Sequence, residues 1–326
     1  MRRIADRLVI AGVGLIGGSL AMALRARGAV GEVVGLGRSV ANLRVARRRG
    51  LIDRAERDPE RAARGADLAL VAVPVGAIAS VVEALARALP PEAVITDAGS
   101  VKGPVVAAVE RVLGASAGRF CGSHPIAGTE HSGAGAALPD LLAGRRCVLT
   151  PTTTTAPLAR RRVRALWEAA GMQVEEMPAA VHDHILALVS HLPHVAAYAL
   201  VNAVADADAG SKRRALIYAA GGFKDWTRIA ASPPEMWRDI CLANRSELLR
   251  ALSGFAAAVE RLRRAIAAGD GDAIAAELAR ASSTRRSLGA AAARPLAAMA
   301  VRRRTRGSGG RRAPPSRAPR DRTGDE

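Results

Sequence analysis

A glycine-rich loop near the N-terminus constrains this chain more than any other feature. The loop, Gly12-Val13-Gly14-Leu15-Ile16-Gly17, follows a short apolar run (8–11) and precedes a run with helical periodicity (18–25). In such a loop the first glycine makes a tight turn, the second lets the backbone approach a pyrophosphate, and the third lets the helix pack on the strand. Phosphates then lie at the helix N-terminus, where free N–H groups favour anions. The loop therefore predicts a strand–helix unit that binds a dinucleotide.

The rest of the first half alternates apolar runs of strand length with helical stretches. This alternation is typical of a parallel sheet with crossover helices. Beyond residue 178 the strand signals stop, and helical patterns continue to about residue 299. We therefore expect an α/β, Rossmann-type dinucleotide-binding domain over 1–178, an all-α substrate-binding and dimerisation domain over 179–300, and a disordered basic tail over 301–326. The expected strands are 8–11, 33–36, 68–73, 94–96, 119–121, 146–150 and 173–177.

The chain is strongly basic, with a net charge of +18 from 48 Lys and Arg against 30 Asp and Glu. Nine Arg and three acidic residues lie in the expected tail. The sequence holds only two Tyr, three Phe and three Trp to stack on bases, so a solvated basic surface is favoured over nucleic-acid binding.

Composition also indicates the compartment. The cysteines Cys121, Cys147 and Cys241 are too widely spaced for a disulfide framework or a thiolate metal site. An N-terminal apolar run (8–24) resembles a signal peptide, but its glycines have the spacing of the phosphate loop. Since no run approaches the ~20 apolar residues of a membrane span, a cytoplasmic protein with no membrane partner is expected.

His124 is the leading candidate for a general base. It precedes Pro125 in a glycine-rich segment after an expected strand, and we expect it in an exposed loop. An imidazole with a pKa near neutrality is the usual general base. His131 and His182 are expected to be surface residues.

Other polar residues follow the ends of expected strands. Val73 and Pro74 end one strand, and the segment from Asp97 through Ser100 to Lys102 ends the next. Open α/β sheets bind ligands at this carboxyl edge.

Four aromatic or imidazole side chains share a spacing in the helical half. His184, His191, His194 and Tyr198 lie at intervals of 7, 3 and 4 residues, which places them on one helix face. Without a carboxylate or thiolate partner this stripe is a poor zinc site, and no metal is expected. We interpret it as the lining of a substrate cleft. Arg228 is a candidate carboxylate clamp, since guanidinium binds carboxylates through two parallel hydrogen bonds.

Several segments together resemble the prephenate/arogenate dehydrogenase family of tyrosine biosynthesis. They are GSHPIAGTEHSG (122–133), SHLPH (190–194), GGFKDWTRIA (221–230) and MWRDI (236–240), and the resemblance covers about 8–299. It implies oxidative decarboxylation of prephenate to 4-hydroxyphenylpyruvate, with arogenate to tyrosine as the alternative, by a homodimer with a small-molecule substrate.

The resemblance also implies roles for individual residues. His124 matches the base that hydrogen-bonds the ring hydroxyl, and Ser100 matches the serine that holds both groups. Arg228 matches the arginine that binds a substrate carboxylate, with Asp225 as its ion-pair partner. Trp237 matches a position that reaches the neighbouring subunit's site. The remaining residues matched to the substrate site are Ser190, His191, His194, Thr129 and Glu130.

The segment after the second expected strand bears on the cofactor. An acidic residue is expected near position 37 to bind the ribose 2′-hydroxyl of NAD, but the sequence there is Gly37-Arg38-Ser39. Arg and Ser suit a 2′-phosphate, so the sequence favours NADP, with NAD still open. The expected cofactor-binding residues are Gly12, Gly14, Leu15, Ile16, Gly17, Arg38, Ser39, Val73, Pro74 and Asp97.

Two other classes remain as alternatives. One is a basic nucleic-acid-binding protein with a vestigial Rossmann fold, whose DNA affinity would fall steeply with salt. The other is a different Rossmann oxidoreductase with a helical dimer domain, which would not carry the GSHPIAG segment.

Overall fold

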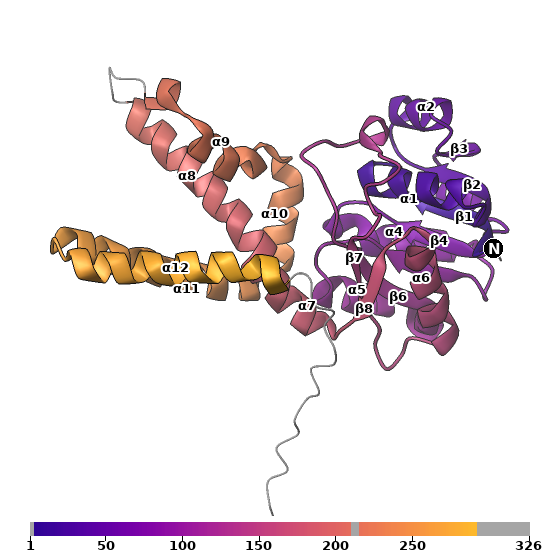
Figure 1. Ribbon diagram of the computed structural model, residues 1–326. Helices are drawn as coiled ribbons and strands as arrows, with labels where there is room; N and C mark the ends of the chain where they lie inside the picture. Colours follow the sequence, from indigo (N-terminus) through magenta and orange to yellow (C-terminus); the bar gives the residue numbers. More distant parts are fainter. Residues whose placement is uncertain (1–2, 210–214, 292–326) are drawn as a thin grey trace, which may run out of the picture. The chain divides into compact units, whose positions relative to one another are not determined.

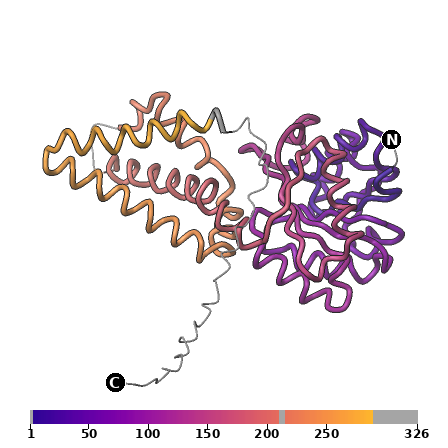
Figure 2. The backbone as a smooth tube through the Cα atoms, turned by 60° about the horizontal axis from the view of Figure 1, so that its bottom comes forward, coloured from indigo at the N-terminus to yellow at the C-terminus, as the bar shows by residue number. Residues whose placement is uncertain are grey.

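The computed structural model describes residues 3–209 and 215–291 (Figure 1). The chain divides into two compact units, 1–258 and 259–326. Figure 2 follows the chain from the sheet, in indigo to magenta, to the helices, in orange to yellow. The expected tail (301–326) lies outside the described residues. The strands are β1 (Ala5–Ala11), β2 (Val30–Leu36), β3 (Arg54–Glu56), β4 (Leu68–Val71), β5 (Val94–Asp97), β6 (Phe120–Pro125), β7 (Arg146–Thr150) and β8 (Gln173–Glu176).

The helices alternate with the strands up to β8, and in the described residues after β8 they follow one another without strands. Those of the sheet domain are α1 (Leu15–Ala26), α2 (Val40–Arg48), α3 (Pro59–Ala63), α4 (Ile78–Ala86), α5 (Gly103–Leu113) and α6 (Pro157–Ala169). Those that follow are α7 (Ala179–Leu186), α8 (Leu192–Ala209), α9 (Gly221–Thr227), α10 (Pro234–Ala243), α11 (Arg245–Ala267) and α12 (Gly271–Ala291). The Rossmann-type sheet followed by helices is the expected fold class.

All eight strands form one sheet in the order β3-β2-β1-β4-β5-β6-β7-β8. Every neighbouring pair is parallel except β6 and β7, which are antiparallel. The expectation of a wholly parallel sheet was therefore wrong at this pair. Residues 126–145 connect β6 to β7 through one short turn, η3 (Ala134–Ala136), and an antiparallel pair needs no crossover helix.

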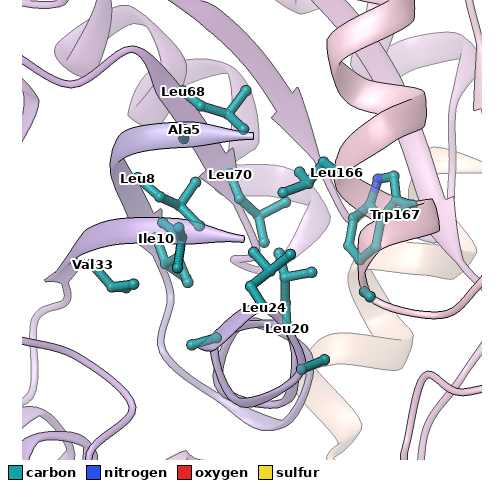
Figure 3. Close-up of a cluster of buried hydrophobic side chains, with 14 of the residues drawn as sticks. Ala5, Leu8, Ile10, Leu20, Leu24, Val33, Leu68, Leu70, Leu166 and Trp167 are labelled. Atoms are coloured by element: carbon teal, nitrogen blue, oxygen red, sulfur yellow. The ribbon is translucent and has the colours of Figure 1, made fainter. Parts of the chain in front are cut away.

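Two apolar clusters lie on opposite faces of the sheet. On one face, side chains of α1, α2 and α6 pack on β1 and β4; Leu20, Leu24, Leu166 and Trp167 belong to this cluster (Figure 3). On the other face, α3, α4 and α5 cover alternate residues of β1, β4 and β5. Because successive strand residues point to opposite faces, all of β4 and residues 8–11 of β1 are buried.

The strand order reverses between β1 and β4. The β1–α1 and β2–α2 units extend the sheet in one direction, and the units after β4 extend it in the other. A crevice opens at the carboxyl ends of strands on either side of such a switch point. The glycine loop follows β1, so it lies at this point.

The helical run over 179–209 is long and apolar. Its mean hydropathy of 1.5 would allow it to cross a membrane by length and composition, and only 28% of its most apolar window is buried. The expectation that no run approaches the length of a membrane span was therefore wrong for this run. It carries the buried polar side chains of His182, Asp183 and His191, which bond to other parts of the same unit, as a helix of a folded domain does.

A buried ion pair organises the carboxyl end of β5. Lys102 and Asp97 are both fully buried and bond to each other. Asp97 also accepts hydrogen bonds from the backbone N–H groups of Gly99 (2.8 Å) and Ser123 (3.1 Å), and Lys102 Nζ donates to the Ser123 carbonyl oxygen (2.8 Å). These bonds connect the loop after β5 to β6.

We predict that Asp97→Asn lowers the free energy of unfolding by about 3–5 kcal/mol, because it leaves the Lys102 ammonium buried without a counter-charge. Urea denaturation measures the loss. Glu83→Gln is the control: it breaks the exposed pair with Arg87 on α4, which is worth about 0.3–0.5 kcal/mol. Equal losses for the two variants would contradict the prediction.

Candidate active site

The glycine loop is closely packed at two of its glycines and open at the third. Gly12 has a φ of +91°, and a Cβ built there would lie 2.2 Å from the Ala72 carbonyl oxygen. A Cβ at Gly17 would lie 2.4 Å from the Gly12 carbonyl oxygen. A Cβ at Gly14 meets nothing within 4 Å. The space beside Gly14 is therefore free for a ligand to approach the backbone.

The start of α1 offers hydrogen-bond donors to that ligand. Gly14 is the N-cap of α1 and contributes no side chain, and the first turn contains no acidic residue. The N–H groups of Leu15 and Ile16 lie in the first turn, where a helix has no internal acceptor for them. Together with the helix dipole they suit a phosphate group. The loop thus fits the pyrophosphate of a dinucleotide.

Arg38 and Ser39 lie between β2 and α2. Ser39 is the N-cap of α2, and its Oγ accepts a hydrogen bond from the Asn42 N–H (3.2 Å). Arg38 is exposed, and within residues 3–209 and 215–291 it forms no ion pair. Its guanidinium is thus available to an anionic group.

The predicted residues after β4 and β5 differ in their surroundings. Val73 lies beside the glycine loop, with its Cγ1 3.1 Å from the position of a Cβ on Gly12, and Pro74 precedes the turn η1 (Val75–Ala77). Asp97 is fully buried and its carboxylate is occupied by Lys102, Gly99 and Ser123. The structure thus gives Asp97 a structural role in place of the predicted contact with the cofactor.

His124 lies on a strand and is buried, contrary to the expectation of an exposed loop. Strand β6 continues to Pro125 because β7 pairs with its second half, and His124 lies opposite Val148. Only 9% of His124 is exposed. A single sequence does not show that residues 146–150 return to cover this segment.

The ring of His124 belongs to a chain of hydrogen bonds. Its Nδ1 lies 2.8 Å from Nε2 of His182, and Nδ1 of His182 lies 2.8 Å from Oδ1 of Asp183. Asp183 also accepts hydrogen bonds from the backbone N–H groups of Lys102 and Gly103, both at 2.7 Å. His182 is fully buried, so the prediction of a surface position for it was wrong.

Burial lowers the pKa of His124 well below its ordinary value, and the charge of Lys102 and the electrostatic cost of a second imidazolium beside His182 and His191 lower it further. The imidazole is therefore neutral at pH 7 and able to accept a proton. Since the unfolded chain binds this proton with a pKa near 6.5, the contribution of His124 to stability is lost as the pH falls below that value.

Ser100 lies half-buried in the loop between β5 and α5. The neighbouring Val101 packs against Trp237 and Ile240 of α10. Within the described residues, Nδ1 of His124 bonds to His182 and not to Ser100. The part of the predicted role in which Ser100 holds the histidine thus belongs to His182.

A turn of π-helix, η4 (Ala187–His191), interrupts the run between α7 and α8. Its extra residue shifts the helix face, so His184 and His191 do not align as their spacing of seven predicted. His184 is exposed and lies 3.0 Å from Glu247. Single-turn π-bulges are frequent at functional sites.

His191 and His194 come together with Trp237 around this turn. His191 is fully buried, and burial lowers its pKa to about 4. Its Nδ1 accepts a hydrogen bond from the Asn244 amide (3.1 Å). The His194 ring stacks on Trp237 with centroids 3.7 Å apart, and His194 Nδ1 donates to the Ser190 carbonyl oxygen (2.9 Å).

The backbone of Ser100 faces the ring of His191, whereas the buried donor Nε1 of Trp237 has no partner within the described residues. An unpaired buried donor is costly, so the Trp237 indole N–H suits a polar ligand. Trp237 is 7% exposed and contacts histidines of its own chain; the predicted contact with a neighbouring subunit remains a proposal.

Arg228 is paired with a different residue from the one predicted. Its guanidinium donates to Oε2 of Glu130 (3.1 Å), and no bond to Asp225 is present in the described part of the chain. Arg228 begins the turn η6 (Arg228–Ala231) after α9, which carries Asp225. Thr129 precedes Glu130, and its Oγ1 accepts a hydrogen bond from the His131 N–H (3.2 Å).

Sequence reasoning missed three residues of the site: His182, Asp183 and Asn244. The Asn244 amide donates to the Asp183 carbonyl oxygen (2.8 Å) as well as to His191. The adjacent His182-Asp183 pair at the start of an apolar helix was the available signal. Within residues 3–209 and 215–291 no group of three His, Cys, Asp or Glu is arranged to hold a metal ion.

Comparison with known proteins matches both halves of the chain to family descriptions. Residues 20–176 match "Prephenate dehydrogenase, nucleotide-binding domain", and residues 178–280 match "Prephenate dehydrogenase, dimerization domain". A cyclohexadienyl dehydrogenase from Zymomonas mobilis is 40% identical over 265 residues, 81% of this chain and 90% of that protein. A prephenate dehydrogenase from Bacillus subtilis is 33% identical over 266 residues, 81% of this chain and 71% of that protein.

Solved structures agree with these matches. A prephenate dehydrogenase from Aquifex aeolicus in complex with hydroxyphenyl propionate and NAD+ superposes with a TM-score of 0.81 at 35% identity, covering 87% of this chain and 98% of that one. An arogenate dehydrogenase from Synechocystis superposes with a TM-score of 0.71 at 29% identity, covering 86% and 99%.

We predict that alanine at Gly12 lowers stability, whereas alanine at Gly14 lowers dinucleotide affinity. Gly12→Ala should lower the melting temperature, because its Cβ meets the Ala72 carbonyl and its φ is positive. Gly14→Ala should leave the melting temperature of the ligand-free protein unchanged, because its Cβ enters open space, but should weaken dinucleotide binding at least ~10-fold, the factor for about 1.4 kcal/mol of lost contact. Thermal unfolding and calorimetric titration test both. A Gly14→Ala variant with unchanged dinucleotide affinity would show that the pyrophosphate binds elsewhere.

Proposed function

The chain belongs to the prephenate dehydrogenase family of NAD-dependent oxidoreductases, and we propose that it oxidatively decarboxylates prephenate with His124 as the general base. The observation that carries this proposal is the buried His124, whose pKa is lowered so that the imidazole is neutral at pH 7. Arogenate is the alternative substrate, since an arogenate dehydrogenase superposes on this chain. It differs from prephenate by an amine in place of the side-chain keto group.

The bound nicotinamide would supply the acceptor for the hydride from the ring carbon that bears the hydroxyl group. His124 takes the hydroxyl proton, which leaves a ring ketone. The ring carboxylate then leaves as carbon dioxide, its bonding electron pair aromatises the ring, and the ring oxygen regains a proton. His124 thus acts first as base and then as acid, a sequence that a neutral imidazole can perform.

Arg228 binds a substrate carboxylate in this proposal. Its guanidinium is held by Glu130 and is largely exposed, so a substrate carboxylate has access to its remaining donors. Ser100 contacts the ring hydroxyl, and Thr129, Ser190, His191, His194 and Trp237 surround the rest of the substrate. Asp225, on the preceding helix α9, remains a proposed residue of the substrate site beside Arg228.

For the cofactor we propose a preference for NADP over NAD. The support is the exposed Arg38, which forms no ion pair in the described ranges, beside the hydroxyl of Ser39. A related enzyme binds NAD+, which supports a nicotinamide dinucleotide as the cofactor. The proposal for this chain is that the cofactor also carries a 2′-phosphate.

We also propose a cytoplasmic homodimer formed through the helical half. Residues 178–280 match a dimerization domain. Apolar side chains of the run over 179–209 are exposed in the isolated chain, including Ile185, Leu188 and Val189, and burial against a second copy would cover them. We propose no nucleic-acid or membrane partner.

The direct test is an assay of the purified protein with prephenate and arogenate, each with NAD+ and NADP+. We expect nicotinamide reduction, carbon dioxide release and formation of 4-hydroxyphenylpyruvate from prephenate. Turnover of arogenate but not of prephenate would make arogenate the substrate. No cofactor reduction with any of the four combinations of substrate and cofactor would refute the proposed function.

His124→Asn should lower turnover ~10²–10⁴-fold while cofactor affinity stays unchanged, because asparagine keeps a polar side chain but is no base. In the wild-type enzyme, turnover should stay constant as the pH falls from 8 to about 6.5 and decline only below that, since the neutral form persists to lower pH. His131→Asn, which removes an exposed imidazole seven residues further along the chain, is the control. Near-normal turnover of His124→Asn would mean that the base lies elsewhere.

Arg228→Ala should raise the Michaelis constant for prephenate more than it lowers turnover, since the guanidinium holds the ground state and transition state alike. Steady-state kinetics measures this split. Arg250→Ala removes another exposed arginine, on α11, and serves as the control. An unchanged Michaelis constant in Arg228→Ala would mean that Arg228 does not bind the substrate and only pairs with Glu130.

Arg38→Ala should remove the preference for NADP, because a charge-assisted contact with the 2′-phosphate is worth ~1.5–3 kcal/mol, or a roughly 10- to 100-fold change in the affinity ratio. Arg48→Ala, at the other end of α2, should leave the ratio unchanged. Wild-type enzyme that uses NAD+ as well as NADP+ would contradict the assignment.

A further inference from the structure

We propose that His182 and Asp183 are positioning residues that keep the proton of His124 on Nδ1 and leave its Nε2 free to accept the substrate proton. The inference deepens the proposed function and rests on His124 as its base. It starts from the unbroken chain of hydrogen bonds from Asp183 through His182 to His124.

The direction of the chain follows from its carboxylate end. Burial raises the pKa of Asp183, but the hydrogen bonds from His182 and from the N–H groups of Lys102 and Gly103 outweigh it, so the pKa lies below its ordinary value. The ionised carboxylate only accepts hydrogen bonds. His182 must then carry its proton on Nδ1, which makes its Nε2 the acceptor, and His124 must donate from its own Nδ1.

The carboxylate is also held rigidly. Its Oδ1 accepts from Lys102 N–H and its Oδ2 from Gly103 N–H, both at 2.7 Å, at the N-terminus of α5. The Asn244 amide holds its backbone carbonyl (2.8 Å). An acceptor fixed in this way orients the imidazole that it binds, as partners of catalytic and ligating histidines generally do.

The surrounding charges determine how strongly Asp183 and His182 stabilise a proton on His124. Lys102, His182 and His191 face His124 and oppose an imidazolium there. The charge of Lys102 is balanced by its pair with Asp97. The carboxylate of Asp183, which bonds to His182, is the negative group that can balance a charge on the two histidines. When His124 takes the substrate proton, the positive charge is therefore shared with His182 and balanced by Asp183.

Asparagine at position 183 removes this directionality. Oδ1 of Asp183 accepts from both the Lys102 N–H and Nδ1 of His182, and Oδ2 accepts from the Gly103 N–H. The amide group of an asparagine therefore faces the Gly103 N–H in one orientation, and the Lys102 N–H together with Nδ1 of His182 in the second. The second arrangement makes His182 Nδ1 an acceptor, moves the His182 proton to Nε2 and forces His124 to carry its own proton on Nε2. The lone pair then points away from the substrate.

Three variants and one control test the proposal. Asp183→Asn should lower turnover ~10²-fold or more with little change in the Michaelis constant. His182→Leu should lower turnover ~10–100-fold, and His182→Gln, whose side-chain oxygen still accepts from His124, should restore most of the loss. His184→Gln changes an exposed histidine of the same helix and should behave as wild type.

Nitrogen-15 NMR of histidine-labelled protein reports the tautomer directly, without turnover. The His124 signal, assigned by its absence in His124→Asn, should show the proton on Nδ1 in wild-type protein and on Nε2 in Asp183→Asn. A proton on Nε2 of His124 in the wild-type protein would overturn the proposal. Normal turnover in both Asp183→Asn and His182→Leu would also overturn it, and so would equal losses of turnover in His182→Leu and His182→Gln. If these variants are normal while His124→Asn is inactive, the positioning role alone fails; if His124→Asn is active, the base itself was misassigned.

Discussion

The carboxylate of Asp183 is the contact on which the rest of the site depends. It accepts two backbone N–H groups where α5 begins, and it accepts the ring N–H of His182. One side chain therefore caps the helix that follows the Ser100 loop and supports the imidazole that reaches His124. The first turn of α5 needs an acceptor for its free N–H groups, so a local requirement of helix formation also holds the catalytic group.

The same arrangement explains why a buried histidine can be a base. Burial alone would leave His124 neutral but free to adopt either tautomer. The hydrogen bond to His182 selects one tautomer, and the antiparallel pairing of β6 with β7 fixes the backbone that carries the ring. Exclusion of water strengthens these electrostatic interactions. The proton acceptor is thus prepared by the fold before any substrate binds.

The sequence predicted the features that depend on local spacing and missed those that depend on distant partners. The glycine loop, its strand and helix, and the start of the helical half at Ala179 follow from short-range patterns. The burial of His124, the exchange of Asp225 for Glu130 as the partner of Arg228, and the structural role of Asp97 all depend on contacts between segments far apart in the chain. The π-turn at 187–191 shifted the register of His184 against His191, which a regular helical period does not reveal.

An NMR titration of His124 in the ligand-free protein tests the central claim most directly, because it follows the protonation of the imidazole itself. The ring signal, assigned through His124→Asn, is followed from pH 8 to pH 5. The account predicts that the signal stays that of a neutral imidazole through pH 6.5 and begins to change only below it, because burial and the neighbouring Lys102 lower its pKa. A midpoint at or above 6.5, the value of an exposed histidine, would contradict it.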